Sequence, residues 1–377
     1  MSGPPDPRRP HRSSWVWCVP VALCVVLGAC SGSGDLASTD ASPAVTTTAT
    51  TASPAPATTT PTAAAEPVVL AISVDGLNPE ALTTLGREGA PAFWRLIDEG
   101  SSTLNARTSY ELTITLPNHT GMMTGRPVQG RSGTSVTFND DNGSTLDAVH
   151  DDYVPGMFDI AHDRGVATAL FAEKDKFAFL VRSWDRNHGA PDETGADDGA
   201  DKLDLAAIAP GGELAGDVAD ALTSGDARLV FWHVAAPDAA GHASGWLGAD
   251  YLAAVREADA RIGAALDAVA ADPALAGRTT VLLTADHGGP RGVDHHDQAD
   301  LIANYRIPFI AWGRGVRAGG DLYALNPGRS DPGTSRPDYT GTQPIRNLDV
   351  ADTVLVMLGL PSIPGAPTTD LPPLALS

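Results

Sequence analysis

The amino-acid sequence predicts an α/β fold, with a central, mostly parallel sheet covered by helices on both faces. Two observations support this prediction. Short apolar runs recur along the chain from residue 67 onward, and stretches with helical periodicity separate them. Most of these runs are rich in β-branched or aromatic residues, which is typical of strands that are buried on both faces of a parallel sheet.

Five segments are expected to form strands, and one helix is especially clear. The expected strands are residues 68–74, 167–172, 229–235, 279–284 and 307–312. The helix is expected at 248–271, where apolar residues recur at three- and four-residue steps: Leu252, Val255, Ala258, Ile262, Leu266 and Val269. Asp272-Pro273 ends it.

The composition excludes several classes of protein. The 377 residues include 46 Asp and Glu but only 25 Lys and Arg, which gives a formal net charge of -21. Because phosphate backbones are bound through Lys/Arg patches, a nucleic-acid polymer is not an expected partner. The only cysteines are Cys18, Cys24 and Cys30. The chain beyond residue 30 therefore has neither a disulfide framework nor a cysteine metal site.

The first 30 residues are expected to be an export signal. Basic residues within the first 12 positions are followed by an uncharged, mostly apolar run from Trp15 to Ala29. This run is too short to span a bilayer and fits a signal peptide. Its end, L-G-A-C at 27–30, resembles the bacterial lipoprotein signal, which implies lipidation of Cys30. We expect export and lipid anchoring to the outer face of the bacterial cell membrane; ordinary secretion and a retained anchor are the alternatives.

Residues 31–66 are expected to form a disordered spacer. Ser, Thr, Ala, Pro and Gly make up 31 of these 36 residues, so the segment has too little apolar surface to build a core. The signal carries a net charge of +2 and the spacer -3, which leaves -20 on residues 67–377. The acidity therefore belongs to the part that is expected to fold.

Residues suited to metal binding follow three of the expected strands. They are Asp75, then Asp238 and His242 in P-D-A-A-G-H, then Asp286 and His287 in A-D-H-G-G, with His295 and His296 shortly after. Ligands of α/β sheets bind at the carboxyl ends of the strands. Carboxylate oxygens and imidazole nitrogens suit Zn²⁺ when thiolates are absent, and also Mn²⁺ or Fe. Each motif is weak alone, but together they predict a metal site.

Thr115 is a candidate nucleophile. It precedes Pro117, which is tolerated in the first turn of a helix, so Thr115 is expected just before a helix begins. At a helix start, the backbone N–H groups and the helix dipole favour a negatively charged oxygen. A hydroxyl there that also binds a metal is activated for attack. An ordinary N-cap is the alternative for an isolated Thr-x-Pro.

These motifs together resemble the alkaline phosphatase superfamily, and most closely its nucleotide pyrophosphatase/phosphodiesterase branch. The resemblance covers residues 68 to about 360. It includes T-L-P-N-H at 115–119, I-P-F-I-A-W-G at 307–313 and Q-P-I-R-N-L-D at 343–349. It implies that residues 67–377 form an alkaline-phosphatase-like phosphodiesterase domain.

The resemblance also implies a site with two Zn²⁺ ions. The first ion would be held by Asp75, Thr115, Asp286 and His287, and the second by Asp238, His242 and either His295, which we favour, or His296. Thr115 would attack phosphorus, and the amide of Asn139 would donate to a non-bridging phosphoryl oxygen. The expected activity is hydrolysis of small phosphoesters, with no protein partner implied.

The sequence also bears on the choice of substrate. Sulfatases of the superfamily carry C/S-x-P-x-R, which this chain lacks, so sulfate esters are disfavoured. Nucleotide-cleaving members commonly have an aromatic residue where this chain has Leu116. Lys174 and Lys176 resemble a Lys-x-Arg pair of phosphomonoesterases, so a phosphomonoesterase that binds substrate through Lys174 is the alternative enzyme. A tethered solute-binding lipoprotein is the non-enzymatic alternative.

Overall fold

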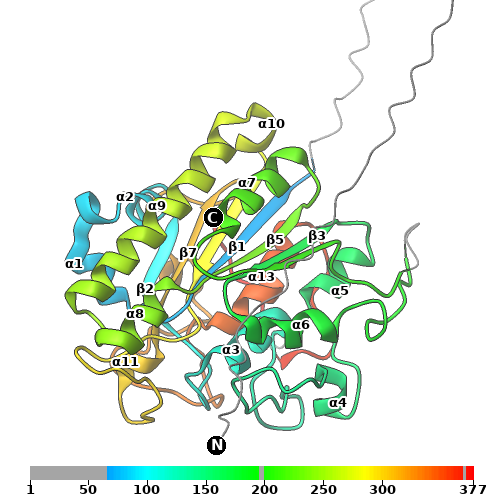
Figure 1. The fold of residues 1–377 in the computed structure, drawn as a ribbon, viewed down its shortest axis with the longest axis horizontal. Helices are drawn as coiled ribbons and strands as arrows, with labels where there is room; N and C mark the ends of the chain where they lie inside the picture. The colour runs from blue at the N-terminus through cyan, green and yellow to red at the C-terminus, as the bar shows by residue number, and fades with distance from the viewer. Residues whose placement is uncertain (1–65, 195–198, 368–370) are drawn as a thin grey trace, which may run out of the picture. The chain divides into compact units, whose positions relative to one another are not determined.

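A computed structural model of the protein describes residues 66–194, 199–367 and 371–377. Eight strands in these residues form one sheet in the order β4-β3-β5-β1-β6-β7-β2-β8 (Figure 1). They are β1 (Val68–Val74), β2 (Ser101–Arg107), β3 (Thr168–Ala172), β4 (Leu205–Ile208), β5 (Leu229–Val234), β6 (Thr279–Thr284), β7 (Arg306–Gly313) and β8 (Gly320–Asp321). Only β7 runs antiparallel to its neighbours, β6 and β2. The predicted mostly parallel α/β sheet is confirmed.

Helices connect the strands. The α-helices are α1 (Pro79–Gly89), α2 (Pro91–Glu99), α3 (Thr115–Thr124), α4 (Leu146–His150), α5 (Met157–His162), α6 (Ala178–Ser183), α7 (Leu214–Ser224), α8 (Ala236–Ser244), α9 (Ala249–Ala271), α10 (Pro273–Ala276), α11 (Ile302–Tyr305), α12 (Leu322–Leu325) and α13 (Val350–Met357). Two short 3₁₀ helices are η1 (Asp175–Phe177) and η2 (Asn347–Asp349).

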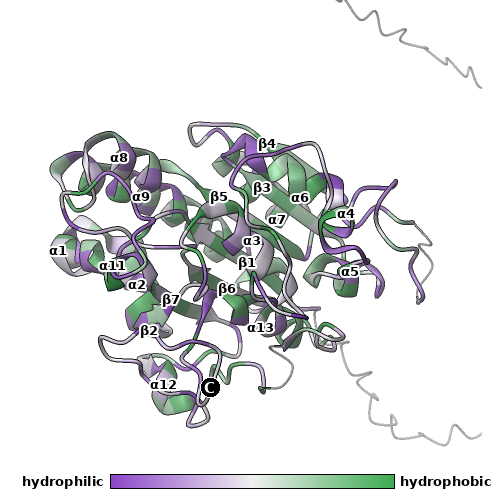
Figure 2. Cartoon of the chain, turned by 90° about the horizontal axis from the view of Figure 1, so that it is seen from below, coloured by the Kyte–Doolittle hydropathy of each residue, from purple (hydrophilic) through white to green (hydrophobic). Residues whose placement is uncertain are grey.

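The helices form a layer on each face of the sheet. On one face, α9 packs against α2, α7 and α8, and α7 contacts β3 and β5. On the other face, α13 contacts β1 and β6 and packs against α3 and α5. Figure 2 shows α8 and α9 on one side of the strands and α13 on the other. The central strands β1, β5 and β6 are buried along their whole length, which explains why their sequences consist mostly of apolar and β-branched residues.

The differences from the predicted strands have physical reasons. β1 and β6 have the predicted bounds, β3 and β5 differ from them by one residue at one end, and β7 is one residue longer at each end. β2, with the sequence S-S-T-L-N-A-R, lies between β7 and the short β8 and has too few apolar residues to stand out. β4 is a partly exposed edge strand of four residues, and β8 has only two.

Four neighbouring parallel strands bring their carboxyl ends to one edge of the sheet. The register pairs Ala172 of β3 with His233 of β5, Val234 of β5 with Val74 of β1, and Ser73 of β1 with Thr284 of β6. The residues that directly follow these strands therefore lie side by side. This edge is where the sequence predicts the metal site.

The predicted signal peptide and its Cys30 lie outside the described residues, as does nearly all of the predicted spacer. Within the described part of the chain, no helix combines the length and the apolar character that a membrane span requires.

Gly100, between α2 and β2, provides a test of this packing. A Cβ at this position would lie 2.0 Å from the carbonyl oxygen of Ala311 and 2.5 Å from that of Leu96. Because both obstacles are backbone atoms, Gly100→Ala should lower the free energy of unfolding by roughly 1–3 kcal/mol. Gly216→Ala is the matched control, since no atom lies within 4 Å of a Cβ there. In helix α7 it should stabilise by roughly 0.5–1 kcal/mol. Urea unfolding of both variants measures the difference, and equal values would contradict the packing.

Candidate functional site

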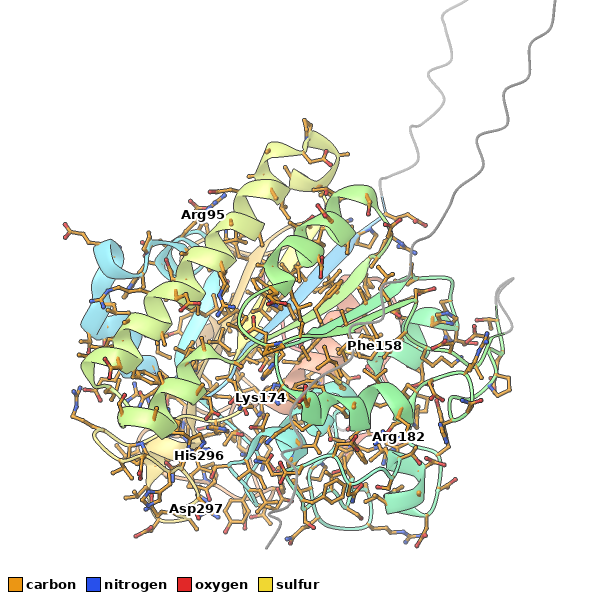
Figure 3. The ribbon with its side chains drawn as sticks, in the orientation of Figure 1. Arg95, Phe158, Lys174, Arg182, His296 and Asp297 are labelled. Atoms are coloured by element: carbon orange, nitrogen blue, oxygen red, sulfur yellow. The ribbon has the colours of Figure 1, made fainter. Side chains whose placement is uncertain are left out.

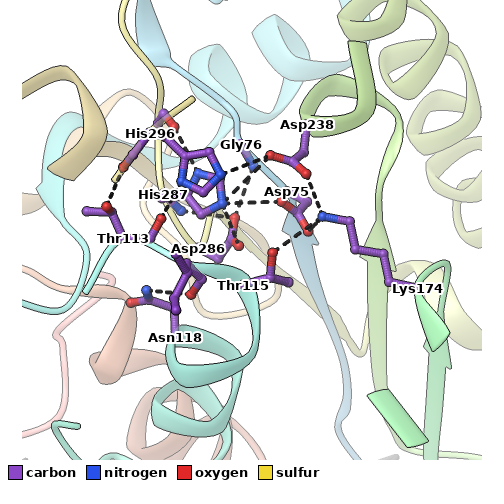
Figure 4. A network of polar contacts seen from close by, with 12 residues as sticks. Asp75, Gly76, Thr113, Thr115, Asn118, Lys174, Asp238, Asp286, His287 and His296 are labelled. Atoms are coloured by element: carbon purple, nitrogen blue, oxygen red, sulfur yellow. Dashed lines mark hydrogen bonds and ion pairs between the residues drawn. The ribbon is translucent and has the colours of Figure 1, made fainter. Parts of the chain in front are cut away.

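Three buried carboxylates meet at this edge of the sheet (Figure 4). Asp75 directly follows β1, Asp286 follows β6 after one residue, and Asp238 lies in the first turn of α8, just beyond β5. All three are at most 3% exposed. Burying three carboxylates together is unfavourable unless cations accompany them.

Each carboxylate has one oxygen that is held by the protein. Oδ1 of Asp286 accepts the backbone N–H groups of Gly76 at 3.0 Å and His287 at 2.9 Å. Oδ2 of Asp75 lies 2.8 Å from Nε2 of His233 and 2.6 Å from Nζ of Lys174. Oδ2 of Asp238 accepts from the same Lys174 Nζ at 2.6 Å.

Three histidines direct their Nε2 atoms to the same place. Nδ1 of His287 donates to the carbonyl of Gly288, Nδ1 of His242 to that of Asp294, and Nδ1 of His296 to that of Thr113. Since Nδ1 carries a proton, Nε2 of each ring faces the carboxylates and presents a lone pair when the ring is neutral. These three nitrogens lie 3.8, 3.5 and 3.7 Å from Oδ1 of Asp238. Backbone carbonyls that fix the Nδ1–H tautomer are the usual second shell of metal-binding histidines.

The structure brings His296 into this cluster and leaves His295 outside it, so the geometry favours His296, the alternative that the sequence left open, over His295. The His295 side chain is half exposed, and its Nδ1 donates to the carboxylate of Asp294. His296 is buried, and its ring stacks on His287 with a centroid distance of 3.7 Å. Thr113 fixes it from both sides, because its carbonyl accepts from Nδ1 and its hydroxyl donates to the His296 carbonyl.

The unpartnered atoms of the cluster fit a bound cation. Four buried side-chain atoms find no hydrogen-bond partner among the described residues: Oδ1 of Asp75, Oδ1 of Asp238, Oδ2 of Asp286 and Nε2 of His287. The Nε2 atoms of His242 and His296 face each other at 3.2 Å, both as acceptors. Two groups of ligand atoms have the spacing of a metal site, Asp75–Asp286–His287 and Asp238–His287–His296. Acceptors that converge in this way, with mixed oxygen and nitrogen atoms, fit divalent metals such as Zn²⁺.

Thr115 is the first residue of α3 and is 2% exposed. Its Oγ1 lies 3.4 Å from Nζ of Lys174. The helix begins one residue earlier than predicted, so Thr115 is the first helical residue. Asn139 approaches the same helix end, where its Oδ1 accepts the backbone N–H of Leu116 at 2.9 Å. This bond leaves the Nδ2 amide of Asn139 as the donor.

The two lysines that the sequence singles out have different surroundings. Nζ of Lys174 lies between the carboxylates of Asp75 and Asp238, whereas Nζ of Lys176 is 4.0 Å from the exposed carboxylate of Asp140. Both line a cavity of about 650 Å³. Figure 3 shows Lys174 and His296 at the same end of the sheet.

Charge and burial strongly shift the pKa values of residues in the cluster. Burial, together with the charge of Asp75, raises the pKa of Asp286 to about 7. Burial acts in the same direction on Asp75, but Lys174 and His233 hold its pKa well below the ordinary value. Burial and the charge of His287 lower the pKa of His296 to about 2, which keeps this ring neutral. Such clustered perturbation is characteristic of functional sites.

Trp246 packs together the segments that carry the candidate ligands. Its buried indole donates to the carbonyl of Gly76, next to Asp75, at 2.9 Å. A Cβ on Gly241 would lie 2.5 Å from the indole, and a Cβ on Gly289 would lie 2.2 Å from it. These glycines come one residue before His242 and two residues after His287. The close approach therefore requires glycine at both positions.

Sequence reasoning assigned no role to several residues that organise the site. His233 is buried in β5 and donates to Asp75; it is the only polar residue in an otherwise apolar strand, and this signal could have identified it. Glu173 follows β3 and has no such signal. His119 belongs to the T-L-P-N-H motif, and its Nδ1 donates to the Thr115 carbonyl at 2.8 Å while Nε2 accepts from Ser73.

The fold and this site define a phosphoester hydrolase of the alkaline phosphatase superfamily, as the comparisons with known proteins bear out. The family model for type I phosphodiesterase / nucleotide pyrophosphatase matches residues 69–130 and 134–341. The chain belongs to this family. No curated protein matches the chain at the significance required.

Solved structures agree on the fold. Murine ectonucleotide pyrophosphatase/phosphodiesterase 5 matches with a TM-score of 0.54 and 14% identity, over 79% of this chain and 96% of that chain. BT1596, a 2-O GAG sulfatase, matches with a TM-score of 0.54 and 13% identity, over 80% of this chain and 72% of that chain. At these identities the likeness concerns the fold alone.

The adjacent histidines His295 and His296 provide a test of the candidate metal site. His296→Ala removes a buried nitrogen that faces Asp238 and His242, so the affinity for Zn²⁺ should fall at least roughly 10-fold. His295→Ala removes a half-exposed ring outside the cluster and should leave the affinity unchanged. Titration of the metal-free protein with Zn²⁺ against a chromophoric chelator measures both. A larger loss in the His295 variant would reverse our assignment.

Proposed function

We propose that the protein is a two-metal phosphodiesterase in which Thr115 is the nucleophile. The first ion would be held by Asp75, Asp286, His287 and Thr115, and the second by Asp238, His242 and His296. The observation that carries this proposal is the convergence of unpartnered acceptors described above. A solute-binding protein would not need it, and family membership favours an enzyme.

The chain's own residues supply the nucleophile and its setting. Thr115 begins α3, where the helix dipole and the amide of Asn139 favour a negatively charged oxygen. Divalent cations, when bound, supply Lewis-acid charge that favours the deprotonated hydroxyl and the leaving oxygen. Oγ1 of Thr115 forms a bond to phosphorus as the bond between phosphorus and the leaving alcohol's oxygen breaks. Thr115 loses its hydroxyl proton, and the leaving alcohol takes up one proton, so the step balances. Water then cleaves the phosphothreonine.

Small phosphodiesters are the substrates that we favour. Family membership supports a diester or pyrophosphate bond as the bond cleaved. The murine relative has been solved in complex with AMP, so nucleotides are reasonable test substrates. Leu116, however, is fully buried and belongs to the hydrophobic core. It therefore offers no surface on which a base could stack. The sulfatase likeness does not extend to the nucleophile, since Thr115 is neither Cys nor Ser.

Metal analysis combined with two model esters tests the proposal. We expect zinc in the purified protein and a higher kcat/KM for bis(p-nitrophenyl) phosphate than for p-nitrophenyl phosphate. Chelation should abolish both activities, and Zn²⁺ should restore them. A protein that binds metal but cleaves neither ester nor a nucleotide diester would contradict the proposal.

Thr115→Ala tests the nucleophile. Without Oγ1 no phosphothreonine forms, so turnover should fall by at least about 10³-fold. Asp75, Asp286 and His287 stay in place, and most of the bound zinc should be retained. Thr115→Ser, which keeps a hydroxyl, should retain measurable turnover. Full activity in a metal-loaded Thr115→Ala variant would exclude Thr115 as the nucleophile.

A phosphomonoesterase is the second candidate, and the position of Lys174 favours it. Its ammonium lies within 3.4 Å of Oγ1 of Thr115 and contacts carboxylates on both sides of the cluster. Burial acts to lower the pKa of Lys174, but Asp75 and Asp238 raise it above its ordinary value, so the group stays charged. A cation at this place suits the second negative charge of a monoester.

Lys174→Ala distinguishes the two candidates. If Lys174 contacts a dianionic phosphate, the kcat/KM for p-nitrophenyl phosphate should fall at least roughly 10-fold more than that for the bis ester. Lys176→Ala is the matched control, because this lysine lines the same cavity but is paired with Asp140. Equal losses on both esters in the Lys174 variant would remove the support for monoester binding by Lys174.

We also propose that the enzyme acts outside the cell, tethered by a lipid on Cys30 through the spacer at 31–66. The L-G-A-C sequence and the composition of the spacer support this proposal. Labelling of cells with a radioactive fatty acid should mark the wild type but not Cys30→Ser.

A further inference from the structure

Glu173 is a buried carboxylate beside the metal cluster that belongs to neither ligand group. It directly follows β3, between the strand and Lys174, and its side chain is 1% exposed. A buried, ionisable side chain so close to the site needs an explanation in terms of its partners.

Three hydrogen bonds fix this residue between two strands and a helix. Oε2 of Glu173 accepts the backbone N–H of Ala235, just beyond β5, at 2.8 Å. Oε1 accepts from Nη1 of Arg261 on α9 at 2.7 Å. The backbone N–H of Glu173 donates to Nδ1 of His233 at 3.2 Å. Both carboxylate oxygens are thus occupied, so Glu173 is not available as a general base.

The bond to His233 determines the state of that imidazole. Because Nδ1 accepts a hydrogen bond, the ring proton lies on Nε2 and is donated to Oδ2 of Asp75. Oδ1 of Asp75 is then the oxygen that remains for a metal, and it is one of the unpartnered atoms of the cluster. Burial lowers the pKa of His233, consistent with a neutral ring.

The same residue fixes the start of the next segment. Lys174 is its neighbour in the chain, and Nζ of Lys174 reaches Asp75, Asp238 and Thr115. Ala235, which Glu173 also holds, is the residue directly before α8, the helix that carries Asp238 and His242. One carboxylate therefore connects the segments that supply Lys174, Asp238 and the partner of Asp75.

We propose that Glu173, held by Arg261, is a positioning residue of the active site: its buried carboxylate fixes the segment whose backbone N–H meets Nδ1 of His233, and with it the Nε2–H tautomer that faces Asp75 and the position of Lys174. Glu173 touches no reacting atom and acts through these two side chains. The expected effect on turnover rests on the proposed function. The expected effects on the His233 tautomer and on metal affinity do not depend on turnover.

Two substitutions separate positioning from simple packing. Glu173→Ala removes both carboxylate acceptors but keeps the backbone N–H that meets His233, so it acts on His233 only by releasing the position of this backbone. Glu173→Gln keeps an oxygen for the Ala235 N–H but loses the charge that faces Arg261. We expect Zn²⁺ affinity and kcat at saturating metal to fall roughly 10- to 100-fold in the Ala variant and by less in the Gln variant. Asp259→Asn is the matched control, because Asp259 is also a buried carboxylate that accepts backbone N–H groups, from Ala92 and Phe93. Asp259→Asn should change the free energy of unfolding but neither the Zn²⁺ affinity nor kcat.

A readout without metal or substrate completes the test. In the metal-free protein with ¹⁵N-labelled histidine, long-range ¹H–¹⁵N spectra should show His233 as the Nε2–H tautomer, and Glu173→Ala should shift its Nδ1 resonance toward a mixture of forms. The signal is assigned from its loss in His233→Gln. Failure of the wild type to cleave any ester would overturn the proposed function but not this inference. An unchanged tautomer together with unchanged Zn²⁺ affinity in Glu173→Ala would overturn the inference, as would losses that match those of Asp259→Asn.

Discussion

The site depends on the burial of three carboxylates at one edge of a parallel sheet. Asp75, Asp238 and Asp286 lie together because the strands that precede them are neighbours with their carboxyl ends aligned. This much negative charge in a water-poor place is unfavourable unless it is compensated by cations or relieved by protonation, as the raised pKa of Asp286 reflects. Lys174 supplies one positive charge from within the chain, and the unpartnered acceptors fit the charge of a bound cation. The net charge of -20 on residues 67–377 therefore does not prevent a small anion from binding at this point.

Orientation is a second requirement, and the backbone meets it. Carbonyl groups of Thr113, Gly288 and Asp294 hold the Nδ1 atoms of the three histidines, so that all three Nε2 atoms point inward. Backbone amides hold Asp286 in the same manner. A site whose ligands are oriented before a metal arrives loses little conformational entropy on binding it. The bond from Thr113 to His296 also links the loop before α3 to a candidate metal ligand, which joins Thr115, the proposed nucleophile, to the cluster.

The sequence was sufficient for the five central strands and for the place of most of the cluster, and the reason is local. The buried strands carry mostly apolar or β-branched residues, and the candidate ligands follow them closely, so Asp75, Asp286 and His287 could be located by counting from a strand end. The choice between His295 and His296 depended on which ring faces inward, which is decided by the bond between Thr113 and His296, residues 183 positions apart. The edge strands β2, β4 and β8 lack a continuous apolar run, and the role of Glu173 arises only from contacts between β3, β5 and α9. Such long-range pairings leave no mark on the local sequence.

The position of Trp246 has a consequence for how this site can change over evolutionary time. One indole fills the space between Gly241 of α8 and Gly289 and also bonds to Gly76, so it touches three segments that carry candidate ligands. A larger side chain at position 241 or 289 would displace the indole and, through it, the other segment. These segments are therefore expected to vary as a unit, with compensating changes at position 246. New substrate preference is more easily acquired at the rim, around Asp140 and Lys176, where the side chains line open space.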